Sequence, residues 1–363
     1  MIARADLGDE VHMSQPRDYS MTGDDGRAAV ARGLADAQWY QTPVARKRLK
    51  ELMQRSDGPA IRDTVLWLGL MVAFATAAIA LWPSWWCVPF FAAYGVLYGS
   101  ASDSRWHEAG HGTAFKTRWM NTAVYQIACF MIVRNPTTWR WSHTRHHSDT
   151  IIVGRDPEIV GMRPPKLGSI ALYFFGVFDL PRGLRTMVRH ALGRISADEA
   201  SYTPESEHRK VFRDARIWTV LYIAIVAACV VRDSWLPALL VGLPRMYGAW
   251  HHVLTGLTQH CGLDEDVTDH RLNSRTVYMN PVSRFIYWNM NYHLEHHMYP
   301  LVPFHHLREL HDEIKHDLPP AIPSIAAAYR QFVPVMFAQR TDPSVCIHPQ
   351  LPAPRLADGT LGA

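Results

Sequence analysis

The chain has 363 residues, of which 48% are hydrophobic and 19% charged, and its formal net charge is +4. The length alone would suit about two soluble domains. The small net charge, with no zinc-finger or RNA-binding signature, excludes a typical nucleic-acid-binding protein. The five cysteines include no CxxC pair, so we expect a reducing compartment and no disulfide framework.

The first sixty residues are polar and have no apolar core, so we expect no secretory signal peptide here. Residues 1–60 are predicted to form a cytoplasmic N-terminal tail. Within it, residues 1 to about 35 are expected to be mostly flexible, because their composition cannot bury enough apolar surface.

Four apolar stretches follow in the rest of the chain. They are Val65–Trp82, Trp85–Ala101, Ile217–Val231 and Trp235–Leu257. A membrane-spanning helix needs about 20 mostly apolar residues. The first stretch carries no charge, the second and third are slightly short, and the fourth is interrupted by Arg245. A buried core helix is the alternative for the weaker stretches.

Short links join these stretches in pairs, which predicts two helical hairpins. The links are Pro83-Ser84 and Arg232-Asp233-Ser234. An even number of crossings leaves the N-terminus and the later histidine clusters on one side. Lys and Arg crowd that side, which identifies it as cytoplasmic. The basic residues before the first and third stretches are Arg46, Lys47, Arg48, Lys50, Arg55, Arg62, Arg209, Lys210, Arg213 and Arg216.

Two further apolar runs are too short to span a bilayer. Thr122–Val133 is predicted to be a re-entrant or interfacial helix, and Leu167–Leu180 to lie along the membrane surface. The polar, proline-rich part after Pro300 is expected to cap the molecule, with a helix near Pro303–His316. Residues 61–320 are thus predicted to form the membrane domain, and residues 321–363 a C-terminal cytoplasmic tail.

Three histidine clusters lie between and after these stretches. They read His107-Glu-Ala-Gly-His111, His143-Thr-Arg-His146-His147 and His293-Leu-Glu-His296-His297. Residues i, i+3 and i+4 share one face of a helix, so each cluster is expected to direct its rings together. Imidazole is a common ligand of zinc, copper and iron, and eight imidazoles are too many for one tetrahedral zinc. Two metal ions, with iron as the best fit, are the simpler interpretation.

At these residues the chain resembles the membrane-bound fatty acid desaturase superfamily. That family has boxes of the form HxxxH, HxxHH and HxxHH, and the surrounding words HEAGHGT, WSHTRHHSDT and NYHLEHHMYP match as well. The resemblance extends from about residue 60 to 320. It implies an all-α integral membrane protein with about four transmembrane helices in two hairpins and a cytoplasmic histidine-rich di-iron cap.

The resemblance also implies the cofactor and the reaction. A ninth imidazole, His260 in GLTQHCGL, would join the other eight in holding two Fe ions, with no catalytic residue beyond the ligands. The reaction would be O2-dependent desaturation of an acyl chain carried on lipid, CoA or a carrier protein. The chain has no glycine-rich nucleotide fingerprint, so electrons would come from an external ferredoxin, rubredoxin or cytochrome-type donor.

Several alternatives stay open at this point. Relatives in the same superfamily include hydroxylases and desaturases of small amino-acid-derived metabolites such as dihydrorhizobitoxine. His107-Glu108-Ala-Gly-His111 is also literally HExxH, the signature of zinc hydrolases with Glu as general base. A transporter or other non-catalytic membrane protein with structural histidines is a further alternative. If the source is prokaryotic, the expected location is the bacterial inner membrane.

Metal-bound histidines usually donate their second ring N–H to a carboxylate or a carbonyl. The candidate carboxylates are Glu108, Asp149, Asp156, Glu158 and Glu295.

Overall fold

The computed structural model describes residues 2–3 and 17–353, and this part of the chain is almost entirely helical. The strands that it contains are β1 (Ile2–Ala3) and β2 (Cys346–Ile347), which pair antiparallel. The prediction of a helical protein is therefore confirmed.

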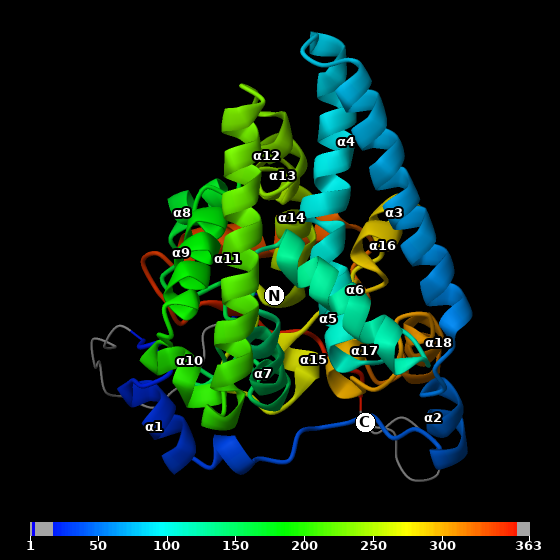
Figure 1. Cartoon of the computed structure of the whole chain (residues 1–363). Helices are drawn as coiled ribbons and strands as arrows, with labels where there is room; N and C mark the ends of the chain where they lie inside the picture. The colour runs from blue at the N-terminus through cyan, green and yellow to red at the C-terminus, as the bar shows by residue number, and fades with distance from the viewer. Residues whose placement is uncertain (1, 4–16, 354–363) are drawn as a thin grey trace.

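Two long helices form the tall columns of the molecule. They are α3 (Asp57–Ala80) and α11 (His208–Val231), on opposite sides in Figure 1. Each has 24 residues, or about 36 Å at 1.5 Å per residue, which exceeds the hydrocarbon thickness of a bilayer. Within the described residues, the stretches Arg46–Ala80 and Glu205–Val231 are long and apolar enough to cross a membrane.

The second half of each predicted hairpin is broken into shorter helices. α4 (Val88–Gly99) leads into α5 (Ala101–His111) through Ser100. On the other side the chain forms α12 (Leu236–Leu240), α13 (Pro244–Gly248) and α14 (Trp250–His260). α4 and α13 pack so closely that a Cβ added to Gly248 would collide with the backbone of Gly95. These glycines let the two halves of the molecule meet.

A buried cluster of charged side chains ties the same two halves together. Arg245 of α13 pairs with Asp103 of α5 and lies 2.6 Å from Asp179 at the start of α9 (Asp179–Ala191). Arg134 approaches Asp103 to 2.7 Å. Buried charges are tolerated when they are paired. The arginine that interrupts the fourth apolar stretch therefore connects α13 with α5 and α9.

The lower end of the molecule in Figure 1 is a cap of short helices. Its members include α7 (Pro136–Ser148), α10 (Ala197–Tyr202), α15 (His270–Asn273), α17 (His293–Met298) and α18 (Leu307–Ile314), whereas α6 (Arg118–Met131), α8 (Leu167–Tyr173), α9 and α16 (Pro281–Tyr287) lie higher in this view. The last helix in the described part of the chain is α19 (Ile325–Ala338). The predicted helices over Thr122–Val133 and near Pro303–His316 correspond to α6 and α18. Short 3-10 turns at Leu34–Asp36, Trp85–Cys87 and Glu205–Glu207 complete the helical elements.

The N-terminal segment runs along the underside of this cap (Figure 1) and includes α1 (Asp24–Ala31) and α2 (Arg46–Leu52). Trp39 donates to the Ser148 carbonyl at 3.0 Å and stacks on His270 at 4.3 Å. Tyr40 donates to Asp317 at 2.6 Å. The expectation of a flexible segment is wrong for residues 17–35, because this region contains α1 and its side chains contact the rest of the chain: Arg17 and Tyr19 contact Glu265, and Arg32 pairs with Asp266. Residues 1 and 4–16 lie outside the described part.

Candidate metal centre

Four helix ends bring the nine predicted histidines together at the cap. α5 carries the first cluster in its last turn, α7 the second, and α17 the third, while His260 is the last residue of α14. Gly112 ends α5 with a positive φ of 70°, a backbone conformation that glycine adopts without steric cost. The nine rings form two groups, and within each group one ligand atom per ring lies within 4.8 Å of the others.

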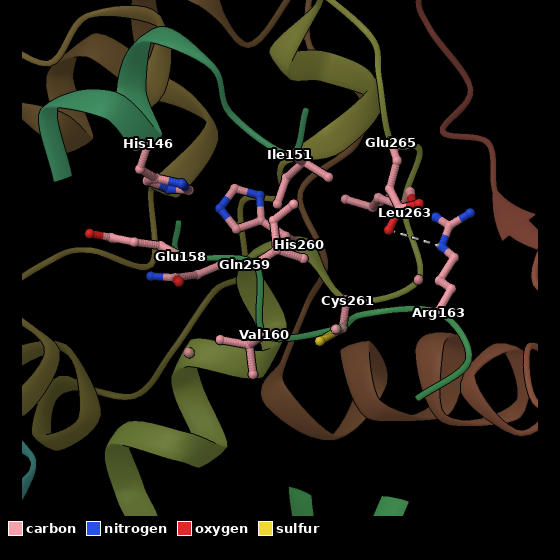
Figure 2. Close-up of a pocket in the computed structure, with 14 residues that line it drawn as sticks. His146, Ile151, Glu158, Val160, Arg163, Gln259, His260, Cys261, Leu263 and Glu265 are labelled. Carbon is pink, nitrogen blue, oxygen red and sulfur yellow. Dashed lines mark hydrogen bonds and ion pairs between the residues drawn. The ribbon is translucent and has the colours of Figure 1, made fainter. Parts of the chain in front are cut away.

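The four-histidine group consists of His146, His260, His293 and His297. Nε2 of His293 lies 2.9 Å from Nε2 of His260 and 3.0 Å from Nε2 of His297. The rings of His146 and His260 lie side by side at the inner end of a cleft of about 550 Å³ (Figure 2). The outer part of that cleft is lined by Arg163 and Glu265, which form an ion pair of 3.5 Å.

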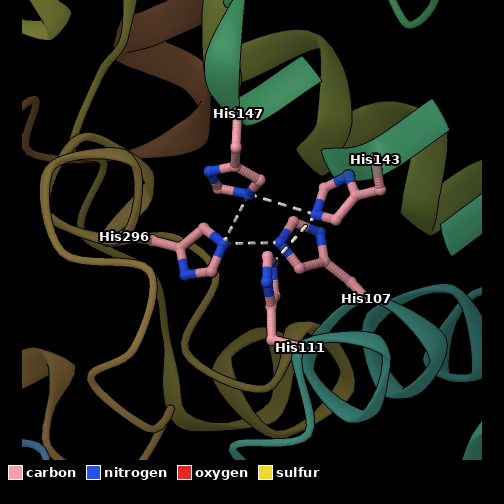
Figure 3. A group of neighbouring side chains, drawn as sticks. All are labelled: His107, His111, His143, His147 and His296. Carbon is pink, nitrogen blue, oxygen red and sulfur yellow. Dashed lines mark hydrogen bonds between the residues drawn. The ribbon is translucent and has the colours of Figure 1, made fainter. Parts of the chain in front are cut away.

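The five-histidine group consists of His107, His111, His143, His147 and His296 (Figure 3). Its Nε2 atoms are 2.8 Å apart for His107 and His296, and 3.0 Å apart for His111 and His143. His147 lies 3.2 Å from both His143 and His296. Two ligands at right angles around a metal, with bonds of about 2.1 Å, are about 3 Å apart. The nitrogens of both groups therefore have the spacing of a coordination shell.

The first histidine cluster stays together in space, since His107 and His111 both belong to the five-histidine group, but the second and third clusters do not, contrary to the expectation that each cluster directs its rings together. His143 and His147 join the five-histidine group, whereas His146 between them joins the other. Likewise, His296 separates from His293 and His297. Neighbouring residues on a helix point about 100° apart. Each HxxHH cluster therefore supplies both groups, and α7 and α17 hold the two groups side by side.

Two of the predicted carboxylates contact histidines of these groups. Glu158 lies 3.0 Å from Nδ1 of His143, and Asp156 lies 2.8 Å from Nδ1 of His146. Burial opposes ionisation of Glu158, but the neighbouring His143 ring lowers the pKa of its carboxyl to about 2. Ionised carboxylates accept from the Nδ1–H groups, which leaves the Nε2 lone pairs free for a metal.

Two neutral groups orient further rings, and sequence reasoning missed both. Nδ1 of His260 donates to the Asn273 carbonyl at 2.7 Å, and Nδ1 of His297 lies 3.2 Å from the Thr150 hydroxyl. A backbone carbonyl from α15 leaves no signal in the sequence. Thr150 follows the last histidine of the second cluster by three positions, so its place in the sequence was the available clue.

Burial and electrostatics keep most of the rings neutral. Burial first, and the neighbouring histidines second, lower the pKa of most of the nine rings well below the usual value. These rings are His107, His111, His147, His260, His293, His296 and His297. For His146, burial acts in the same direction, but Asp156 outweighs it and raises the pKa. Neutral imidazoles with free lone pairs are the form that binds metal ions.

The other three candidate carboxylates have different partners. Glu108 accepts from the Thr113 hydroxyl at 2.7 Å and from the Phe304 N–H at 3.1 Å, and burial raises its pKa to about 7. Glu295 accepts from Thr276 and contacts His311, and Asp149 pairs with Arg155 and Arg145. Both hydrogen bonds use Oε1 of Glu108, and they direct its carboxyl toward Thr113 and Phe304.

A second cleft, of about 790 Å³, borders the five-histidine side of the cap. Trp139 and Ser142 of α7 form its inner wall, and Ser142 precedes His143. Trp106 separates this wall from the histidines, with its ring 5.4 Å from Trp139 and 5.2 Å from His143. The remaining lining is mixed, and its polar members include Arg134, Asp179, Arg182, His190, Glu199 and Tyr202.

The fold and the site define a helical protein that has two helices long and apolar enough to cross a membrane and two groups of histidines that could bind metal ions. The profile of the fatty acid desaturase family matches residues 80–329, a range that contains all nine histidines, and the chain belongs to this family. Membership makes it an oxidoreductase of lipid metabolism, in a family that uses iron.

Known relatives agree with this assignment. The chain is 24% identical to the endoplasmic reticulum acyl-lipid omega-3 desaturase (cytochrome b5) of Arabidopsis thaliana, over 81% of this chain and 76% of the relative. It is 25% identical to a probable fatty acid desaturase of Sorghum bicolor, over 78% and 73% of the two chains. An endoplasmic reticulum omega-3 fatty acid desaturase of Nicotiana tabacum is 24% identical over 56% of this chain and 58% of its own length.

Proposed function

We propose that the chain is an O2-dependent membrane desaturase whose nine histidines hold two iron ions. The observation that carries this proposal is the division of nine imidazoles into two groups with nitrogen spacings of 2.8–3.2 Å. When bound, the irons would supply the oxidant that removes hydrogen from an unactivated C–H bond.

The protein's own residues provide the setting for that chemistry. Asp156 and Glu158 fix the tautomer of His146 and His143. Trp106 and Trp139 place bulky rings between the second cleft and the five-histidine group, which limits water at the reacting carbon. Two electrons would come from an external donor of ferredoxin, rubredoxin or cytochrome type; the name of the Arabidopsis relative includes cytochrome b5.

We further propose that α3 and α11 cross the membrane as the first halves of two hairpins, with the cap in the cytoplasm. The second halves would be α4 in the first hairpin and α12 to α14 in the second. The outer faces of the columns support this arrangement, because Val72, Val220 and Val226 are each at least 63% exposed, and such apolar surface is stable in lipid. The excess of Lys and Arg before α3 and α11 supports a cytoplasmic cap.

The proposed substrate is an acyl chain, as the names of the plant relatives suggest. The second cleft supports another candidate, a small amphiphile with charged groups such as an amino-acid-derived metabolite. Its lining includes Arg134, Arg182 and Glu199, and polar groups in a cleft favour ligands that pair with them. A zinc hydrolase is disfavoured, because Glu108 is held by Thr113 and Phe304.

The test combines metal content with product analysis on the full-length protein in detergent. We expect about two irons per chain and, in host membranes, a lipid with one additional double bond that is missing when His296→Ala replaces the wild type. A small hydrophilic product instead would favour the second substrate class, and a hydroxylated product the hydroxylase alternative. One zinc, or no metal after anaerobic purification, would overturn the proposal.

A further inference from the structure

Asp264, Cys346 and His348 form a third group of metal-ligand side chains, separate from the nine histidines. We infer that this group binds one divalent cation of the zinc type, held by a carboxylate, a thiolate and an imidazole. The inference does not depend on the proposed desaturase reaction. The site lies where the C-terminal segment, with Cys346 and His348, contacts the loop after α14, which carries Asp264.

The backbone explains why these three residues meet. After His260, Gly262 turns the chain with a positive φ of 76°, and Asp264 follows two residues later. The Ile347 N–H of β2 donates to the Gly262 carbonyl at 2.7 Å. Alternate residues of an extended strand point to opposite faces. Cys346 and His348 therefore face Asp264, while Ile347 packs against the apolar cluster around Phe332.

The distances among the three side chains are close to those of ligands on one cation. Sγ of Cys346 lies 3.4 Å from Nε2 of His348 and 3.0 Å from Oδ1 of Asp264. Sulfur and nitrogen ligands of a tetrahedral zinc are about 3.6 Å apart. A small outward movement of the three side chains would therefore make room for the ion. Nδ1 of His348 lies 3.0 Å from Oδ2 of the same carboxylate, so the imidazole and the carboxylate also face each other.

Charge and burial favour a cation at this place. Cys346 is only 4% exposed, and the Asp264 side chain is 14% exposed. Arg163 is nearby, but its guanidinium pairs with Glu265 at 3.5 Å and donates to the carbonyls of Leu263 and Pro343. A carboxylate and a thiolate together would balance the charge of a divalent ion. The His348 side chain is 37% exposed, so water can reach the fourth position.

Such an ion would have a structural effect on the neighbouring desaturase residues. Asp264 follows the proposed iron ligand His260 by four positions, and Leu263 and Glu265 line the cleft that ends at His146 and His260. A cation at Asp264 would fasten the C-terminal segment to this loop. It would thus restrain one wall of the cleft without contacting the reacting atoms.

Cobalt substitution tests the inference, because both histidine groups supply nitrogen and only a thiolate ligand gives a sulfur-to-cobalt charge-transfer absorption. The full-length protein in detergent is loaded with Co²⁺ alone and scanned. We expect this absorption in the wild type, its loss in Cys346→Ser, and at least tenfold weaker cobalt retention in His348→Gln. Cys261→Ser and His316→Gln serve as matched controls, a buried thiol and an exposed imidazole, and should keep the absorption.

Absence of the absorption in the folded wild type, or its persistence in Cys346→Ser, would overturn the inference. The wild-type measurement decides the question even if a variant fails to fold. Iron counted in the purified protein before it is loaded with cobalt separates this inference from the proposed function. A sulfur-to-cobalt absorption without two irons would support the third site and overturn the desaturase proposal. Two irons without this absorption would support the desaturase proposal and overturn the third site.

Discussion

The five-histidine group and the four-histidine group share α7 and α17, whereas α5 contributes only to the first and α14 only to the second, and the two groups differ in their surroundings. In the five-histidine group, the Trp106 ring packs 5.2 Å from His143 and 5.8 Å from His107. Two rings of the four-histidine group, His146 and His260, instead line a cleft directly. The first group is therefore packed against a tryptophan ring, and the second has fewer ligands and forms part of a cleft wall.

The groups also differ in how their rings are oriented. A carboxylate orients one ring in each group, Glu158 for His143 and Asp156 for His146. The four-histidine group adds a carbonyl and a hydroxyl, at His260 and His297. With fewer rings, this group depends more on the orientation of each. The comparison suggests that loss of a ligand damages either group, whereas loss of an orienting residue is felt more strongly in the four-histidine group.

The largest expected effect is that of His296→Ala. Nε2 of His296 lies 2.8 Å from His107 and 3.2 Å from His147, so removal of this ring opens the centre of the five-histidine group. Desaturase activity should fall by more than about 100-fold, beyond the loss typical of an outer-shell residue, and iron content should drop to about one ion per chain. Product analysis and elemental analysis check this. His316→Gln, on the cap surface, is the control, and normal turnover by His296→Ala would refute the ligand assignment.

The next largest effect should come from Asp156→Asn, compared directly with Glu158→Gln. Outer-shell changes typically cost about 10- to 100-fold in metal affinity or activity. Asp156→Asn should reduce iron affinity by a factor near the upper end of this range, because Asp156 also accepts from the N–H groups of Ile151 and Glu158 at 2.8 Å each. Glu158→Gln should reduce iron affinity by a factor near the lower end, since the side-chain partners of Glu158 are Ser142 and His143. Iron retention at limiting iron measures both, and the opposite order would contradict the comparison of the two groups.

All nine histidines could be chosen from the sequence, but their division into two groups could not. Box spacing and family resemblance identify the residues, and their role as metal ligands stays a prediction. The split of His146 from His143 and His147 depends on how α7 is rotated against α17, which is a tertiary property. The Asn273 carbonyl is equally hidden, because every residue has a carbonyl and only folding brings this one to His260.

The fold, too, could be predicted from the sequence only in part. Hydropathy predicted α3 and α11 well, because a long uncharged run has few alternatives. It could not predict that α12, α13 and α14 would be separate helices, or that Arg245 would be paired with Asp103 on α5. The order of residues 17–35 was also missed, since this polar segment is held by individual contacts, such as those of Arg17 and Tyr19 with Glu265, rather than by an apolar pattern.

A smaller effect is expected for Thr150→Val, which tests the neutral orienting contacts of the four-histidine group. The Thr150 hydroxyl also donates to the His146 carbonyl at 2.7 Å, so it links the end of α7 to the His297 ring. Valine keeps the shape and removes the hydroxyl. A loss of one hydrogen bond of about 1 kcal/mol corresponds to about a fivefold decrease in activity. Thr144→Val, at an exposed position of the same helix, is the control and should change nothing.

The smallest effect is expected for Glu108→Gln, although Glu108 lies between two proposed ligands in the sequence. The glutamine carbonyl can still accept from Thr113 and from the Phe304 N–H, as Glu108 does. Activity and iron content should therefore stay within about twofold of the wild type. A general base contributes about 100- to 10,000-fold, so a loss of that size would revive the hydrolase alternative. Glu108 is adjacent to His107 in the sequence, but the two side chains contact different partners. The variant therefore tests whether His107 and His111 act as members of the five-histidine group or as part of an HExxH hydrolase motif.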